Sequence, residues 1–153
     1  MSRRTLLSAC ALLAAAFLAI GYYVSAADDK KPHHHRHGPH LDCAKACDDC
    51  ARSCDACAAH CAKMLAEGKK EHLKTLQTCQ DCATHCSAAS CIAAREGPFS
   101  DLICTACADA CKRCGDACEK FRDDEMMRDC AQECRRCEKA CREMLKHVAR
   151  DGR

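Results

Sequence analysis

Cysteines spaced alternately three and four residues apart are the feature that most restricts how this chain can fold. The mean step is close to 3.5 residues, which keeps the side chains on one face of a helix that packs in a bundle. No strand has this period. Four separate runs of cysteines therefore predict four helices, each with a stripe of thiols along one face. The runs are Cys43, Cys47, Cys50, Cys54, Cys57 and Cys61; Cys79, Cys82 and Cys86; Cys104, Cys107, Cys111, Cys114 and Cys118; and Cys130, Cys134, Cys137 and Cys141.

Helix breaks fall between the runs of cysteines. Gly68 follows the first run, and Gly97-Pro98 follows the second as a stop and then a new start. Asp123 and Asp124 can cap a further helix. Because the connections are short, neighbouring helices should be antiparallel. The prediction is an all-α, up-down-up-down four-helix bundle with a Cys-lined core, whose helices cover about 41–66, 71–95, 98–121 and 124–149.

The composition excludes a conventional hydrophobic core. Of 153 residues, 20 are Cys, none is Trp, and aromatic residues make up only 3%. A bundle lined only by protonated thiols would bury little hydrocarbon, so something else should fill or crosslink its interior. The length suits a single domain. A formal net charge of +2 gives no reason to expect a nucleic-acid partner.

Residues 1–26 have the features of an export signal. Arg3 and Arg4 precede an apolar run that ends in small residues near Ala26, and the paired arginines resemble the twin-arginine signal, which exports folded proteins. We expect cleavage, an exported and periplasmic protein with no membrane segment in its mature form, and 19 mature cysteines once Cys10 is removed. Residues 27–40 are predicted to be a disordered linker, and the bundle domain is assigned to 41–149. The linker contains imidazoles that could capture metal loosely: His33, His34, His35, His37 and His40.

Several uses of nineteen thiols can be compared. Disulfides are common in exported, Cys-rich chains, but disulfide scaffolds are rich in loops and irregular in spacing, and nineteen is an odd number. Redox catalysis of the thioredoxin type needs a Cys-x-x-Cys pair in a βαβ context, whereas the six such pairs here lie inside predicted helices. Thiolates are also soft metal ligands. A zinc or cadmium detoxification module and a disulfide-stapled structural protein remain alternatives to copper storage.

Charge balance favours monovalent copper among the metals. Zinc ions held by four thiolates each would number roughly five and would leave a buried charge of about −9. Cu(I) can replace each thiol proton one for one, since a thiolate can bridge two ions, and the interior then stays nearly neutral. Eight Cys-x-x-x-Cys pairs, each able to hold one ion, lie along the predicted helices. The chain is thus predicted to be a non-enzymatic store of Cu(I), holding between ten and about nineteen ions.

The four cysteine stripes, together with the stretch His60-Cys61-Ala62-Lys63-Met64 at the end of the first predicted helix, resemble the bacterial copper storage proteins. The resemblance covers residues 41–149 and is to the exported branch, in which a His-Cys-x-x-Met stretch occupies this place. It implies a four-helix bundle that binds many Cu(I) ions along its core, with His and Met at the open end. Carried over to this chain, His60 and Met64 are mouth ligands beside Cys57 and Cys61.

Four further residues are weaker candidates. His72 and Met127 lie in phase with the stripes at the same end as the mouth ligands, and Met144 lies in phase at the opposite end. A neutral imidazole or thioether suits exchangeable copper, although Met is also a common core filler. Cys91, five residues after Cys86, falls off the stripe and is retained among the candidate metal ligands.

Two other histidines, His85 and His147, lie off the stripes and are expected at the surface. Copper ions are the expected ligand of the chain. A protein that donates or receives copper, and a homo-oligomer, are both compatible with the sequence.

Overall fold

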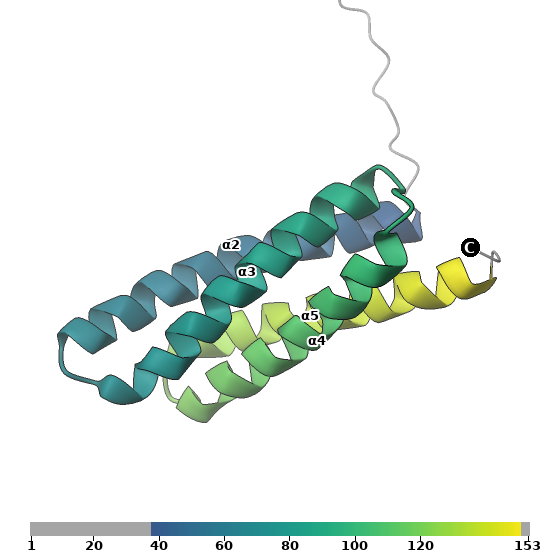
Figure 1. Ribbon diagram of the computed structural model, residues 1–153. Helices are drawn as coiled ribbons and strands as arrows, with labels where there is room; N and C mark the ends of the chain where they lie inside the picture. The colour runs from purple at the N-terminus through teal and green to yellow at the C-terminus, as the bar shows by residue number, and fades with distance from the viewer. Residues whose placement is uncertain (1–37, 151–153) are drawn as a thin grey trace, which may run out of the picture. The chain divides into compact units, whose positions relative to one another are not determined.

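The computed structural model describes residues 38–150, which form an antiparallel bundle of four long helices (Figure 1). Helix α2 packs against α3 and α5, and α4 packs against the same two helices, so all four surround one axis. The predicted architecture is confirmed, and each predicted helix end lies within three residues of an observed one. The predicted export signal lies outside the described residues. The elements are α2 (Pro39–Ala66), η1 (Lys70–His72), α3 (Leu73–Ala94), α4 (Ser100–Cys118), η2 (Glu119–Phe121) and α5 (Glu125–Arg150).

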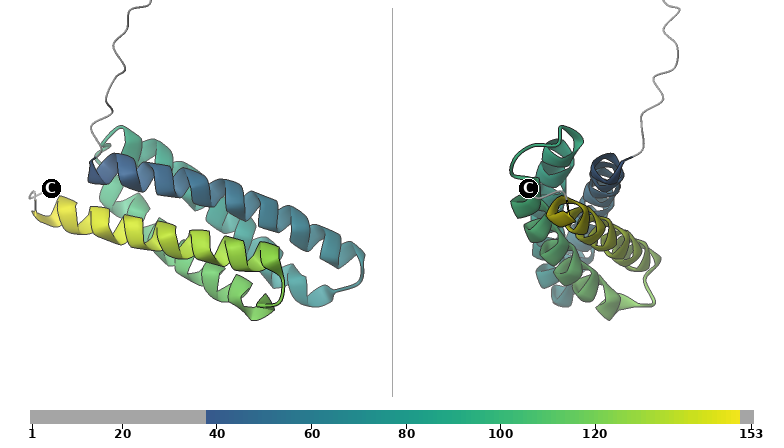
Figure 2. Two further views of the ribbon diagram at one scale, coloured as in Figure 1. Left: turned by 180° about the vertical axis from the view of Figure 1, so that it is seen from behind. Right: turned by 90° about the vertical axis from the view of Figure 1, so that its right-hand side faces the viewer.

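The two ends of the bundle are built from different parts of the chain. The α2–α3 and α4–α5 connections lie at one end, which we call the mouth end and define as residues 60–72 and 118–127. The start of α2, the α3–α4 connection and the end of α5 lie at the other (Figure 2). We call this the distal end and define it as residues 38–43, 93–104 and 141–150.

Local sequence explains where the helices begin and end. Pro39 occupies the first turn of α2 after an extended Gly38, a favourable start because proline has no N–H to leave unpaired. At the start of α5, Asp124 Oδ1 accepts a hydrogen bond from Met127 N at 3.2 Å, which confirms the predicted acidic cap. Gly68 ends the α2 segment with a φ of +87°, in the left-handed region that favours glycine.

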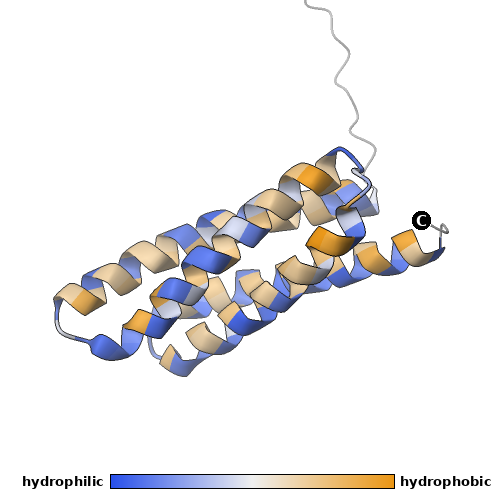
Figure 3. Ribbon diagram, in the orientation of Figure 1, coloured by the Kyte–Doolittle hydropathy of each residue, from blue (hydrophilic) through white to orange (hydrophobic). Residues whose placement is uncertain are grey.

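The core consists almost entirely of cysteine and alanine. Eighteen cysteines are buried within residues 38–150, and the alanines between them let the helices approach closely. Met127 and Met144 are the largest fully buried side chains in this part of the chain. No Lys, Arg, Asp or Glu is buried among the described residues. Saturated orange, which marks the strongly hydrophobic residues, accordingly appears only at scattered points of the ribbon (Figure 3).

Charged residues cover the outer faces and link α4 to α5. Arg135 on α5 donates hydrogen bonds to Asp116 at 2.6 Å and to Glu119 at 2.9 Å. Its guanidinium lies over Gly115, where an added Cβ would come within 2.9 Å of Arg135 Cζ. Exposed ion pairs of this kind each contribute little to stability. Among residues 38–150, no helix combines the length and the apolar character needed to cross a membrane.

Replacing Gly68 with Ala should destabilise the metal-free bundle by about 1 kcal/mol, because an L side chain is strained at a positive φ. Urea denaturation of the reduced protein measures this loss. The neighbouring Glu67→Ala variant is the control, since Glu67 is exposed and has a φ of −80°. An unfolding free energy for the Gly68 variant equal to that of the unchanged protein would show that this turn is not strained.

Candidate metal centre

The thiol groups of the four helices converge on the bundle axis. Each of the eighteen core cysteines is at most 1% exposed, as predicted from the stripes. Cys91 is the exception and is exposed on α3. All nineteen cysteines of the described residues are free thiols, so the core seen here is not a disulfide core.

Neighbouring sulfur atoms lie at distances that suit a bound metal ion. The Sγ atoms of Cys86, Cys107 and Cys111 form a triangle with edges of 3.5, 3.6 and 4.0 Å. An ion at the centre of such a triangle would lie about 2.1 Å from each sulfur, close to the metal–thiolate distance of about 2.3 Å known for zinc. The spacing is far longer than an S–S bond of about 2.05 Å.

Triangles of thiols share edges along the column. Cys82, with Sγ–Sγ distances of 3.9 Å to Cys86 and 3.8 Å to Cys111, forms a second triangle on the same 3.5 Å edge. Groups of four thiols overlap in the same way, since Cys50 and Cys134 each belong to two groups. The core is therefore a continuous network and not a row of separate four-ligand sites. The groups whose sulfur atoms lie within 4.8 Å of one another include Cys47, Cys107, Cys137 and Cys141; Cys50, Cys82, Cys86 and Cys111; Cys50, Cys54, Cys82 and Cys134; Cys54, Cys114, Cys130 and Cys134; and Cys57, Cys79, Cys118 and Cys130.

The shortest thiol contacts run between helices and not along one helix. Within α2, the Sγ atoms of Cys43 and Cys47 are 4.0 Å apart, whereas Cys141 on α5 lies 3.7 Å from the first and 3.6 Å from the second. The predicted pairs along one helix therefore become parts of larger groups. Sequence spacing alone could not show this, because it does not fix the register between helices.

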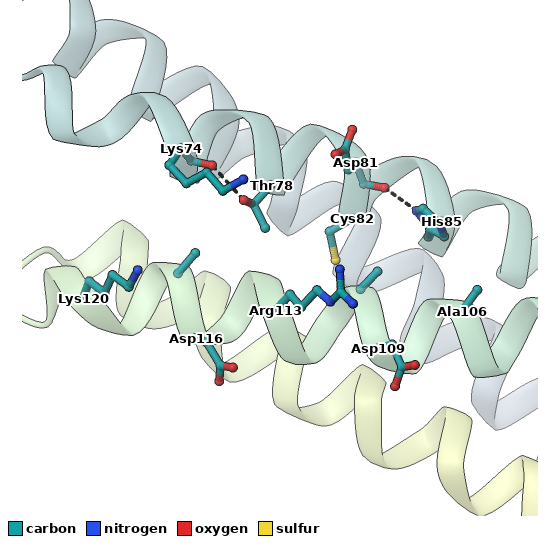
Figure 4. A pocket seen from close by; sticks show the side chains of 12 residues that line it. Lys74, Thr78, Asp81, Cys82, His85, Ala106, Asp109, Arg113, Asp116 and Lys120 are labelled. Carbon is teal, nitrogen blue, oxygen red and sulfur yellow. Dashed lines mark hydrogen bonds between the residues drawn. The ribbon is translucent and has the colours of Figure 1, made fainter.

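The side of the bundle keeps water from the thiols. A groove of about 590 Å³ lies between α3 and α4, and Cys82 is the cysteine among its lining residues. Its side chain points from α3 toward α4, with Arg113 across the groove (Figure 4). Cys82 is nevertheless only 1% exposed. His85, expected at the surface, lines the same groove and bonds through Nδ1 to the carbonyl oxygen of Asp81 at 2.9 Å.

The two predicted mouth ligands lie at the mouth end but are engaged in other contacts. His60 Nε2 is 2.7 Å from a carboxylate oxygen of Asp124, and Met64 Sδ accepts a hydrogen bond from the Lys69 ammonium group at 3.2 Å. Although burial opposes it, the hydrogen bond from His60 helps to hold the pKa of Asp124 below its ordinary value. Copper binding at either residue would have to replace these partners.

Met127 and His72, two of the further candidate ligands, are both buried. Met127 is fully buried, and its Sδ accepts a hydrogen bond from Cys57 Sγ at 3.4 Å. His72 is 4% exposed, and its ring stacks on Phe121 with centroids 4.2 Å apart. Within the described part of the chain, its Nδ1 has no hydrogen-bond partner. Both could be predicted from the sequence because they lie in phase with the cysteine stripes. A thioether and an imidazole are thus buried at this end of the bundle.

Burial raises thiol pKa values at the two ends of the column. Desolvation by burial raises the pKa of Cys61, at the mouth end, to about 12. At the distal end, a hydrogen bond with Cys141 lowers the pKa of Cys104, but a hydrogen bond with Cys43 and burial outweigh it and raise the value to about 12. Metal-free thiols at these positions are therefore uncharged at neutral pH.

The reduced, metal-free bundle should lose stability as the pH rises from 9 toward 12. An unfolded chain ionises its thiols near the ordinary pKa of 9.0, whereas the folded chain keeps Cys61 and Cys104 protonated to about 12. Their stabilisation is therefore complete below pH 9 and is lost as the pH approaches 12. Urea unfolding at pH 7, 9 and 10 under reductant measures the change, and Cys61→Ser with Cys104→Ser should weaken it. Unfolding free energy that is unchanged or higher at pH 10 would contradict the assignment.

Comparison with known proteins connects this geometry to copper. The family model described as copper storage protein matches residues 7–146. Among solved structures, the Streptomyces lividans copper storage protein loaded with 10 copper equivalents has 30% identity and a TM-score of 0.66, over 78% of this chain and 93% of that one.

A second structure, the Cu(I)-bound copper storage protein BsCsp3, has 33% identity and a TM-score of 0.63, over 71% of this chain and 99% of that one. A third, described as a cytosolic copper storage protein from Streptomyces lividans with five coppers, has 33% identity and a TM-score of 0.65, over 71% of this chain and 92% of that one. A search of curated proteins gave no match. On the family match and these structures, the chain belongs to the copper storage protein family.

Proposed function

We propose that this chain stores Cu(I) ions in the thiol column of its bundle, with the core cysteines as ligands. The observation that carries the proposal is the network of edge-sharing thiol triangles, such as those on the 3.5 Å edge between Cys86 and Cys111. A shared edge lets one thiolate bridge two ions. Storage is binding and not catalysis, in keeping with the family to which the chain belongs.

Charge supports a monovalent ion. The core of residues 38–150 contains no Lys or Arg to balance thiolates, so the metal must supply the positive charge. One Cu(I) per thiolate leaves the column neutral, whereas zinc at one ion per four thiolates would leave eighteen core thiolates with a charge of about −9. Since Cys91 is exposed, the one-per-thiol limit for the core is 18 ions.

The mouth end suits the entry of copper. Met127 Sδ lies 3.4 Å from Cys57 Sγ, so an ion bound to the thioether is already beside a core thiol. His60 and Met64 lie further out and bind groups that water and ions can replace, namely the Asp124 carboxylate and the Lys69 ammonium group. Neutral ligands of this kind hold Cu(I) less firmly than thiolate and so favour transfer inward.

Anaerobic titration with Cu(I) against a coloured chelator should show between ten and about nineteen ions bound per chain, with Cu(I) preferred over Zn(II). The loaded protein should also melt at a higher temperature than the metal-free protein, because the ions bind the folded state. Saturation near four or five ions, with zinc preferred, would favour the zinc or cadmium alternative. A metal-free protein with few reactive thiols would favour the disulfide alternative.

Two single variants test whether the copper ions bind in the core. Cys111→Ser removes a thiol shared by two triangles and should lower the number of bound ions. Cys91→Ser is the matched control, since the same substitution falls on an exposed cysteine outside the column. An equal loss in both variants would contradict storage in the core.

Export through the twin-arginine route is a separate part of the proposal. It depends on Arg3, Arg4 and the apolar run that follows, and export of a folded protein would protect the thiols from oxidation during transfer. One relative is described as cytosolic, so the family alone does not decide the compartment.

Replacing both Arg3 and Arg4 with Lys should leave unprocessed protein inside the cell, whereas the unchanged chain should appear in the periplasmic fraction in a shorter form. Immunoblots of fractionated cells, with a marker for each compartment, measure the distribution. Normal export of the double variant would rule out the twin-arginine route.

A further inference from the structure

The helix faces that carry the thiols continue past the last cysteines at the distal end. His40 lies three residues before Cys43 on α2, and Met144 lies three residues after Cys141 on α5. Side chains three residues apart share a helix face, so both belong to the stripe that lines the column. Both are buried, with His40 7% exposed and Met144 fully enclosed. His40 falls within the predicted linker, but α2 begins at Pro39 and includes it.

The environment of the His40 imidazole is unusual. Both of its ring nitrogens are buried and have no hydrogen-bond partner among residues 38–150. Burying a polar atom without a partner is unfavourable, so such groups are rare unless a ligand completes them. The ring of His147, on the last turns of α5, lies edge-on to that of His40 with centroids 6.2 Å apart.

Two hollows reach this part of the bundle from outside. One of about 420 Å³ lies along α2 and α5 and is lined by Cys43, Met144 and His147 among others. A second, of about 80 Å³, is lined by His40 and Val148 together with the α3–α4 connection. The larger hollow has Cys43 and Met144 among its lining residues, although both side chains are fully buried. Cys43 belongs to the last thiol group, in which its Sγ lies 3.7 Å from Cys141 Sγ and 3.8 Å from Cys104 Sγ.

The two ends of the column share a pair of buried groups. At the mouth end they are Met127 and His72, the latter with an unpaired ring nitrogen; at the distal end they are Met144 and His40. In both pairs the methionine comes from α5. Methionine alone is an ordinary core filler, but a buried histidine with a ring nitrogen that has no partner among residues 38–150 is not.

We propose that the distal end is a second Cu(I) site, in which His40 and Met144 bind an ion together with the Cys43 thiolate, and through which copper enters or leaves the column. The proposal rests on the storage function stated above. One ion binds and the Cys43 proton passes to solvent, so the site stays neutral and no oxidation or reduction takes place. His147, at the edge of the larger hollow, is the imidazole that an arriving ion meets first.

Diffraction at the copper absorption edge tests the site directly in crystals of the Cu(I)-loaded protein. An anomalous peak is expected between the His40 ring and Met144 Sδ. It should disappear in the variant His40→Gln/Met144→Leu, while the peaks along the core remain. A loaded core with no peak at this position overturns the distal site and leaves the storage function intact. A core without copper overturns the storage function itself.

The rate at which a chelator removes copper tests the passage. If copper passes through both ends, the distal variant His40→Gln/Met144→Leu and the mouth variant His72→Gln/Met127→Leu should each slow copper removal by about twofold. A variant that combines all four substitutions should slow removal by about tenfold or more. The matched control is His85→Gln/Met126→Leu, which makes the same two substitutions at residues outside the column. Removal from the distal variant at the unchanged rate, in both the normal and the mouth-variant background, overturns the passage.

Both substitutions approximately conserve volume, and circular dichroism with a count of reactive thiols checks that each variant folds. If the distal variant does not fold, the anomalous map of the unchanged protein decides the question by itself.

Discussion

Close contact among uncharged thiols is the interaction on which the rest of this structure depends. Eighteen cysteines replace the large apolar side chains that would fill an ordinary bundle, and their sulfur atoms lie as close as 3.5 Å to one another. This packing is tolerable without metal only while the thiols keep their protons, because a column of thiolates would place uncompensated charge in a dry interior. Copper removes the constraint, since each ion supplies the charge that the departing proton carried.

The distribution of cysteines among the helices determines the shape of the column. Helix α3 contributes only three core cysteines, Cys79, Cys82 and Cys86, and its stripe continues toward the distal end with Ala89 and Ala93. The other three helices therefore supply the outermost distal thiols. The small alanines leave room there for the larger side chains of His40 and Met144.

Cysteine spacing was enough to predict the helices, their antiparallel order and the convergence of thiols, because one period describes all four segments. Spacing could not reveal which residues meet across the bundle. For example, the sequence predicts His60 as a mouth ligand, but it does not show that His60 Nε2 lies 2.7 Å from the Asp124 carboxylate at the start of α5. The register of α2 against α5 brings Met127 to Cys57, a contact that phase alone left undecided.

The start of α2 differs from the predicted start for another reason. A polar, His-rich run led to the expectation that the helix starts after His40. The pair Gly38-Pro39 is, however, a good helix start, with an extended residue followed by proline in the first turn. This start places His40 on the core face, three residues before Cys43.

Coordination at the ends of the column explains why imidazole and thioether, and not further thiols, occupy these positions. An ion in the middle of the network has thiolates above and below it, and each is shared with a neighbouring ion. An ion at either end lacks the outer neighbour, so a further thiolate there would belong to one ion alone and would add a negative charge without a partner. A neutral group, such as the thioether of the buried Met127 or Met144, would complete the coordination of such an ion without that charge. The sequence of ligands from neutral ends to a thiolate centre thus follows from charge balance along the column.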